Sequence, residues 1–270
     1  MTERPKVTQM HLAEMKRSAT PITMLTAYDA SMAGMFDRAG IDCILVGDSL
    51  GNVIQGRDST VPVSVAHMVY HIECVRRGSR RALLIGDMPF LSYADAATAI
   101  DTARALMQAG AEMVKLEGGS AVLEIVRRLV DLGVPVCGHL GLTPQSVHQL
   151  SGYRVQGRAP EAKARLIEEA AALERAGCAL LVLECIPQAL AAEVAANLVI
   201  PVIGIGAGAK VDGQVLVSYD ALGLGTGRKP RFVRDFAAGA ESIEAAVQAF
   251  IAAVRDRRFP SNEESYGDGE

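Results

Sequence analysis

One pattern recurs along most of the sequence: a short apolar run, a polar turn, an amphipathic stretch, and a glycine before the next apolar run. This alternation is typical of βα units, in which each strand is followed by a helix that packs against a parallel sheet. The apolar runs predict eight strands, at residues 22–27, 43–47, 82–86, 113–116, 134–137, 180–183, 201–205 and 215–217. The stretches between them predict helices at 31–39, 65–77, 93–109, 121–132, 160–176 and 188–198, several ending at a glycine that fits a helix C-cap.

Eight such units indicate a single (β/α)8 TIM barrel of the α/β class. A chain of 270 residues with 50% hydrophobic content can bury one deep core, and all-parallel barrels run to roughly 250 residues as one domain. We therefore expect one catalytic barrel domain over residues 1–260, with an N-terminal helix at 8–18 capping the barrel bottom and a last helix at 241–255. Residues 141–160 predict a long loop over the face of the strand ends, and the polar residues 261–270 a mobile tail.

Charge and composition exclude several classes of partner. The net charge is -4 with acidic and basic residues mixed and no tryptophan, so no basic face or stacking platform is available for nucleic acid. The five cysteines lack a CxxC pair, which favours buried thiols in a reducing cytoplasm. The N-terminus has no apolar signal core and no run is long enough to cross a bilayer, so neither export nor membrane insertion is expected.

Polar, chemically capable side chains stand at the ends of five of the predicted strands. A parallel barrel places the carboxyl ends of all its strands on one face, where its chemistry occurs. Five residues should therefore converge there: Asp48, Asp87, Glu117, His139 and Glu184. Lys115 precedes Glu117 by two, so on a strand both side chains point the same way.

These residue types indicate metal-assisted chemistry on a carbonyl compound. Asp48, Asp87 and Glu117 supply the hard oxygen ligands of a Mg2+ site, and the zinc-type spacing of Cys and His is missing. Bound Mg2+ would polarise a carbonyl and stabilise an enolate. Lys115 offers a positive charge for a substrate carboxylate. Glu184 lies in an apolar run, where burial would raise its pKa and suit it to remove a proton from carbon.

Each of these residues taken alone also has a structural interpretation. A single Asp after a strand more often caps a helix or stabilises a turn than binds a metal. Glu184 alone fits an ion pair, and His139 fits either the surroundings of a metal or a hydrogen-bonded buried imidazole. Five polar strand ends in one chain favour a site.

Nine segments carry a resemblance to a known family. They are MLTAYDA (24–30), LVGDSLGNV (45–53), MVYHIECVRRG (68–78), GDMPFLSY (86–93), VKLEGG (114–119), GHLGLTPQSVHQLSGYRVQGR (138–158), ECIP (184–187), PVIGIGAG (201–208) and DGQVLV (212–217). In these segments the chain resembles the ketopantoate (3-methyl-2-oxobutanoate) hydroxymethyltransferases of pantothenate biosynthesis. The long 138–158 block is the most specific, and the matches run in order along nearly the whole chain.

The resemblance implies a role for each matching residue. Asp48 and Asp87 would hold Mg2+, with Glu117 completing the acidic set through water. Asp48, Ser49, Asp87 and Lys115 would contact the 2-oxo acid. Glu184 would be the proton acceptor, and His139 would lie near the site as a possible second layer around the metal.

The resemblance also implies the fold, the co-substrate and the assembly. The family fold is a (β/α)8 barrel, the one-carbon donor is 5,10-methylenetetrahydrofolate, the product is 2-dehydropantoate, and members often form homodecamers. Two positions depart from the family pattern: Tyr219 and Glu264 stand where His is usual. Both lie outside the catalytic set.

Two other functions compete with this one. A carbon–carbon lyase of the isocitrate lyase type also uses a metal and a 2-oxo acid, but it relies on an exposed cysteine on a mobile loop, and no cysteine here lies in such a loop. A binding module that lost the chemistry would lack a ligand or the base, whereas all are present.

Overall fold

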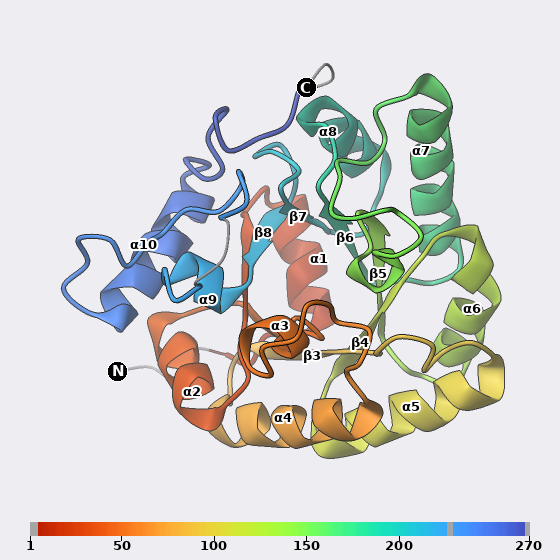
Figure 1. Ribbon diagram of the computed structural model, residues 1–270, viewed down its shortest axis with the longest axis horizontal. Coiled ribbons are helices and arrows are strands. Elements are labelled where there is room, and N and C mark those ends of the chain that lie inside the picture. Colours follow the sequence, from red (N-terminus) through yellow and green to blue (C-terminus); the bar gives the residue numbers. More distant parts are fainter. Residues whose placement is uncertain (1–4, 226–228, 268–270) are drawn as a thin grey trace.

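The computed structural model describes residues 5–225 and 229–267, and its centre is a closed barrel of parallel strands (Figure 1). All eight predicted strands are confirmed, and their order around the barrel follows their order in the chain. They are β1 (Ile22–Thr26), β2 (Cys43–Val46), β3 (Leu83–Asp87), β4 (Met113–Glu117), β5 (Val136–Gly141), β6 (Leu180–Glu184), β7 (Val202–Ile205) and β8 (Gly213–Leu216).

The barrel closes where β1 pairs in parallel with β8, Ile22 lying opposite Gly213. Because every neighbouring pair is parallel, all strands end on the same face of the barrel. The strands are almost wholly buried on both sides, as expected when helices cover the outside and side chains fill the inside. The (β/α)8 fold predicted from the sequence is thus confirmed.

Helices surround the strands, and each predicted helix is present within a few residues of its expected bounds (Figure 1). The long ones are α1 (Gln9–Arg17), α2 (Ala30–Ala39), α4 (Val65–Gly78), α5 (Ala96–Ala109), α6 (Leu123–Asp131), α7 (Pro160–Arg175), α8 (Gln188–Asn197) and α10 (Ile243–Arg255). Three short turns of helix were not expected: α3 (Leu50–Val53), α9 (Ser218–Ala221) and the 3₁₀ turn η2 (Pro144–Ser146). A further 3₁₀ turn, η1 (Ser120–Val122), forms the start of the helix predicted at 121–132.

Local chemistry explains where the helices start and stop. Asp29 caps α2 by accepting hydrogen bonds from two backbone N–H groups, and Gly40 ends it in the left-handed conformation that glycine tolerates. Gly78, expected as a C-cap, is instead the last residue of α4, and Ser79 caps the helix. A Cβ at position 78 would clash with the carbonyl oxygen of Ala30, so this glycine allows α4 to approach α2 closely.

Helix α1 covers the amino-terminal end of the barrel, as predicted, and is seen through the ring of strands in Figure 1. Its Leu12 is fully buried. The Lys16 ammonium lies 2.8 Å from the Asp212 carboxylate just before β8, and it donates hydrogen bonds to the carbonyl oxygens of Ala195 and Ile200. These contacts leave the opposite, carboxyl-terminal face for the site.

The segment after α10, for which we expected a mobile tail from residue 261, packs on the barrel as far as it is described. Gln188 donates its backbone N–H to the Tyr266 carbonyl oxygen at 2.9 Å, and the Ser265 side chain is buried. Glu264, one of the two departures from the family pattern, accepts hydrogen bonds from the Arg234 guanidinium at 2.8 and 2.6 Å. Residues 268–270 of the expected tail lie outside the described residues.

In the part of the chain that the structure describes, we find no helix with both the length and the apolar character needed to cross a membrane.

Candidate active site

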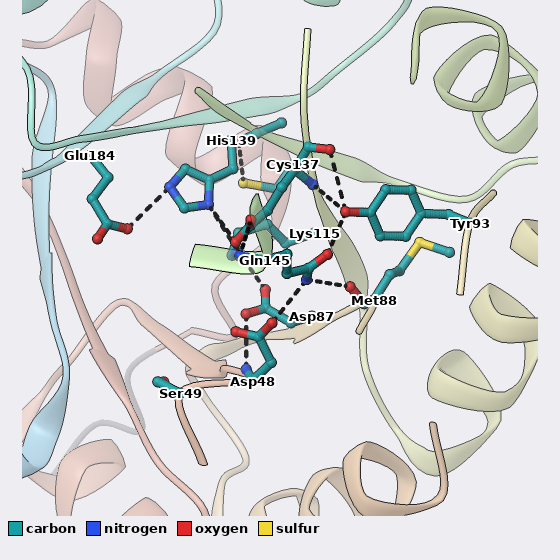
Figure 2. Close-up of polar contacts among 12 residues, drawn as sticks. Asp48, Ser49, Asp87, Met88, Tyr93, Lys115, Cys137, His139, Gln145 and Glu184 are labelled. Carbon is teal, nitrogen blue, oxygen red and sulfur yellow. Dashed lines mark hydrogen bonds and ion pairs between the residues drawn. The ribbon is translucent and has the colours of Figure 1, made fainter. Parts of the chain in front are cut away.

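The five polar strand ends predicted from the sequence gather at the carboxyl-terminal face of the barrel (Figure 2). Asp87, Glu117 and Glu184 are the last residues of β3, β4 and β6, while Asp48 follows β2 by two residues. His139 lies within β5, which is longer than predicted and runs on to Gly141. The contacts below join these residues and Lys115 into one continuous network.

Asp48 and Asp87 form a buried pair at one end of the network. The backbone N–H of Asp48 donates to Asp87 Oδ2 at 3.1 Å. Burial, and then the charges of Asp87 and Glu117, raise the pKa of Asp48 well above its ordinary value. Two buried carboxylates this close are favourable only beside a cation or a proton.

Ser49 lies beside this pair, as the resemblance implies. A Cβ built on Gly47 would lie 2.8 Å from Ser49 Oγ and 3.5 Å from Asp87 Oδ2, so both side chains border the same glycine. The Ser49 hydroxyl also forms a hydrogen bond with the Tyr28 hydroxyl at 2.9 Å. Tyr28 in turn packs 5.9 Å from the ring of Tyr219, the other departure from the family pattern.

Lys115 connects the acidic pair to the centre of the network. Its Nζ lies 2.8 Å from Asp87 Oδ1 and 4.0 Å from Glu117 Oε1. Burial alone would lower the pKa of Lys115, but the charges of Asp87, Glu117 and Asp48 raise it above its ordinary value. The ammonium is therefore charged and held inside the barrel mouth.

His139 bridges two carboxylates at the other end of the network. Its Nδ1 lies 3.2 Å from Glu117 Oε1, and its Nε2 lies 3.2 Å from Glu184 Oε2. Burial and the nearby Lys115 charge would lower the pKa of His139, but its contacts with Glu117 and Glu184 raise it to about 9. The imidazole thus lies between the two carboxylates, and its Nδ1 is also 3.3 Å from the Lys115 ammonium.

Glu184 is the most accessible acid of the network. Its side chain is 15% exposed, compared with 3% for Asp87 and for Glu117. The sequence led us to expect burial in the apolar run, and at the last position of β6 the residue is only partly buried. One carboxylate oxygen faces His139, so the other is available to a molecule entering the barrel mouth.

Gln145 belongs to the site, although the sequence did not single it out. It lies in η2 and is buried. Its side-chain amide donates hydrogen bonds to Asp48 Oδ2 and to the Met88 carbonyl oxygen, both at 2.9 Å. Its backbone N–H donates to Glu117 Oε2 at 3.0 Å. The residue appears in the 138–158 block, but a lone amide in a loop has no periodicity that marks it as functional.

The donor set fits a Mg2+ ion better than a metal held wholly by protein. Within residues 5–225 and 229–267, no three His, Cys, Asp or Glu side chains are grouped so as to hold a metal by themselves. Mg2+ commonly takes one or two carboxylates and completes its shell with water and substrate oxygens. Asp87 Oδ1 is buried and, apart from its ion pair with Lys115, accepts no hydrogen bond among the described residues.

Charge balance supports the same conclusion. The network gathers four carboxyl groups around the Lys115 ammonium and the His139 imidazole. A divalent cation would offset the repulsion from Asp87 and Glu117 that helps to raise the pKa of Asp48. Both oxygens of Glu117 are already engaged, one by His139 and one by Gln145. Asp87 is engaged likewise, Oδ1 by Lys115 and Oδ2 by the backbone N–H of Asp48, so these contacts alone do not rank the carboxylates as ligands.

Comparison with known proteins gives close relatives over nearly the full length. The profile of the family described as ketopantoate hydroxymethyltransferase matches residues 6–262. A protein of Shewanella loihica named 3-methyl-2-oxobutanoate hydroxymethyltransferase is 55% identical over 261 residues, which cover 97% of this chain and 99% of that protein. A protein of an Azoarcus species with the same name is 55% identical over 262 residues, with coverages of 96% and 97%.

Solved structures that are distant in sequence share the fold. Phosphonopyruvate hydrolase in complex with oxalate and Mg2+ has a TM-score of 0.60 at 13% identity, over 96% of this chain and 93% of that one. The 2,3-dimethylmalate lyase, described as a member of the PEP mutase/isocitrate lyase superfamily, has a TM-score of 0.57 at 18% identity, with coverages of 80% and 82%. At these identities the likeness concerns the barrel alone.

Proposed function

The chain belongs to the ketopantoate hydroxymethyltransferase family, and on this premise we propose that its barrel adds a hydroxymethyl group to 3-methyl-2-oxobutanoate to give 2-dehydropantoate. It is then an enzyme of one-carbon transfer that serves pantothenate biosynthesis. The co-substrate we propose is 5,10-methylenetetrahydrofolate, as the family resemblance implies.

The acidic pair is proposed to hold Mg2+ and, through it, the substrate. Asp48 and Asp87 would be the direct ligands and Glu117 a ligand through water. Mg2+, when bound, supplies Lewis-acid polarisation of the keto group and stabilises the negative charge that develops there. The oxalate and Mg2+ found together in a protein of the same fold support this choice, because oxalate carries adjacent oxygens like those of a 2-oxo acid.

Lys115 and Ser49 are proposed to orient the 2-oxo acid. The Lys115 ammonium is buried beside Asp87 and suits a substrate carboxylate, with which it makes a charge-assisted hydrogen bond. The Ser49 hydroxyl, next to the same carboxylate, can donate to a substrate oxygen. Together they would place C3 of the substrate toward β6.

Glu184 is proposed to remove the proton from C3. The C–H electron pair then passes into the enolate, and C3 forms a bond to the methylene carbon of the folate as one of the two C–N bonds of that carbon breaks. Water replaces the second nitrogen and supplies the hydroxyl oxygen. The proton from C3 and one proton from water go to the two nitrogens, and tetrahydrofolate leaves. His139 lies between Glu117 and Glu184, with its Nε2 3.2 Å from one carboxylate oxygen of the base, and would help to orient it.

The observation that carries this proposal is that the proposed metal ligands and the proposed base lie apart in the site. The Asp48–Asp87 pair lies at one end of the network and Glu184 at the other, with Lys115, Glu117 and His139 between them (Figure 2). A carbonyl compound anchored at the acidic pair would extend toward Glu184. Metal-assisted enolisation needs this arrangement of electrophile and base.

Location and assembly are further parts of the proposal. The five cysteines are free, which agrees with a reducing cytoplasm. The family resemblance implies a homodecamer. Met10 and Val199 expose 76% and 82% of their surface near the bottom of the barrel and are candidates for such contacts.

The experiment combines 3-methyl-2-oxobutanoate, 5,10-methylenetetrahydrofolate and the purified protein, with 2-dehydropantoate detected by mass spectrometry. We expect product with Mg2+, none after chelation, and recovery when Mg2+ is restored. Full activity of a rigorously metal-free sample would remove the metal from the mechanism. Absence of product with every component present would refute the proposed function.

A further inference from the structure

The side-chain amide of Gln145 uses both of its N–H groups and its oxygen in hydrogen bonds. Its two N–H groups donate to Asp48 Oδ2 and to the Met88 carbonyl oxygen, each at 2.9 Å, and its Oε1 accepts from the Tyr93 hydroxyl at 2.6 Å (Figure 2). A backbone carbonyl can only accept, so the contact with Met88 fixes which end of the amide carries the N–H groups. The orientation of Gln145 is therefore determined by its neighbours.

Tyr93 is itself held in place. The backbone N–H of Glu117 donates to the Tyr93 hydroxyl at 3.3 Å. The hydroxyl has two acceptors, the Glu117 carbonyl oxygen at 3.3 Å and Gln145 Oε1 at 2.6 Å, and the shorter contact is the one with Gln145. The backbone N–H of Gln145 donates in turn to Glu117 Oε2 at 3.0 Å. Gln145 and Tyr93 thus tie the loop after β5 to the ends of β3 and β4, and we call these two side chains the amide brace.

The amide brace acts on one oxygen of Asp48 only. Gln145 engages Oδ2, and among the described residues no donor reaches Oδ1. A neutral amide restrains the carboxylate without adding positive charge, so it does not compete with a cation as a lysine would. Asp48 is left with one free oxygen of fixed direction.

We propose that the amide brace positions Asp48 as a one-oxygen ligand and thereby favours Mg2+ over the larger Ca2+. Mg2+ demands near-ideal octahedral geometry with short bonds, whereas Ca2+ accepts both oxygens of a carboxylate and irregular shells. An Asp48 free to rotate would accommodate Ca2+ more easily. Gln145 and Tyr93 are in this view positioning residues, and the inference depends on the Mg2+ site of the proposed function.

Cation binding measured directly tests this proposal. Titration calorimetry with MgCl2 and with CaCl2 is carried out on the wild type, Gln145→Leu, Tyr93→Phe and the control Gln156→Leu. The Gln156 side chain lies in the same loop and donates to the Arg154 carbonyl oxygen, away from the acidic pair. Mutation of a residue that holds a metal ligand in place typically lowers the metal affinity by ~10–100-fold.

We expect Gln145→Leu to weaken Mg2+ binding by ~10–100-fold and Ca2+ binding by less, so that the preference for Mg2+ shrinks. Tyr93→Phe should change the preference in the same direction by a smaller factor, and Gln156→Leu should leave it unchanged. A general loosening of the fold would weaken both cations alike and leave the preference intact, which would overturn the proposal.

Tyr93→Phe keeps the test decisive if Gln145→Leu does not fold, because it removes one hydroxyl and keeps the ring. If the wild type binds Mg2+ and both variants fold but keep the same preference for Mg2+ over Ca2+, the role of the amide brace is refuted and the proposed function is not. A wild type that binds no Mg2+, even with 3-methyl-2-oxobutanoate present, would refute the metal site itself and this inference with it.

Discussion

Replacing Glu184 by Gln should stop removal of the C3 proton while leaving the acidic pair intact. The amide has almost the same size and can keep the 3.2 Å contact that the Glu184 carboxylate makes with His139 Nε2. Among the described residues, Glu184 has no contact with Asp48 or Asp87, so binding of the metal and the oxo acid should persist. What the variant loses is the ability to accept a proton.

The magnitude follows from the position of the residue. A positioned acid–base group is worth ~10²–10⁴-fold in rate, which corresponds to about 3–5 kcal/mol of transition-state stabilisation. Glu184 is the most accessible acid of the network and contacts His139 through one oxygen only, so we expect the loss to lie toward the upper end.

Proton exchange provides the assay, because enolisation requires no folate. The wild type with Mg2+ in heavy water should exchange the C3 proton of 3-methyl-2-oxobutanoate, followed by proton NMR. Glu193→Gln makes the same atomic change on an exposed position of α8 and should exchange at the wild-type rate. If Glu184→Gln exchanges as fast as the wild type, Glu184 is not the base, and His139 becomes the next candidate.

Three further predictions concern anchoring, packing and pH. Lys115→Met should raise KM for the oxo acid and lower kcat, because it removes the buried ammonium beside Asp87. Unchanged KM and kcat would show that Lys115 is only a structural ion-pair partner. Gly78→Ala should lower the free energy of unfolding in urea by about 1–3 kcal/mol because its Cβ would clash with the Ala30 carbonyl oxygen, whereas Gly34→Ala, with nothing nearer than 3.4 Å, should not. Burial opposes ionisation of Asp37, but hydrogen bonds from the backbone N–H groups of residues 80–82 lower its pKa. The stability that ionised Asp37 confers is present above its ordinary pKa of 3.8 and is lost as the pH falls through the lower pKa of the folded state. The difference in the free energy of unfolding between wild type and Asp37→Asn, measured in urea, should therefore narrow from pH 5 to pH 3. A constant difference would contradict this assignment.

The barrel could be predicted because its signals are local. Each strand is an apolar run and each long helix has an amphipathic period, both readable within a window of a few residues. The end of β5 was placed too early, at residue 137, because Gly138 and His139 resemble the start of a loop, whereas barrel pairing with β4 and β6 continues the strand to Gly141. Short helices such as α3 and α9 contain too few residues for any period.

The site could be predicted only in part, because only some of its residues are marked by a local pattern. Asp48, Asp87, Glu117 and Glu184 follow strands, and the topology of a parallel barrel brings strand ends together. Gln145 acquires its role from Asp48, 97 residues away in the sequence, and nothing in its own neighbourhood announces this contact. Loop residues whose partners are distant are the ones that a reading of the sequence passes over.

The pairing of β1 with β8 also governs how this protein can emerge from the ribosome. Every residue of the network lies at or before position 184, yet the barrel that holds them stays open until Gly213–Leu216 has been synthesised. Until then β1 and β7 present unpaired edges, which are templates for association with other chains. Arg255 of α10 adds a later step, because its guanidinium binds the Asp42 carboxylate just before β2. A nascent chain therefore leaves one edge of β1 without its partner strand until residue 216 has been added, although β2 can pair with the other edge early.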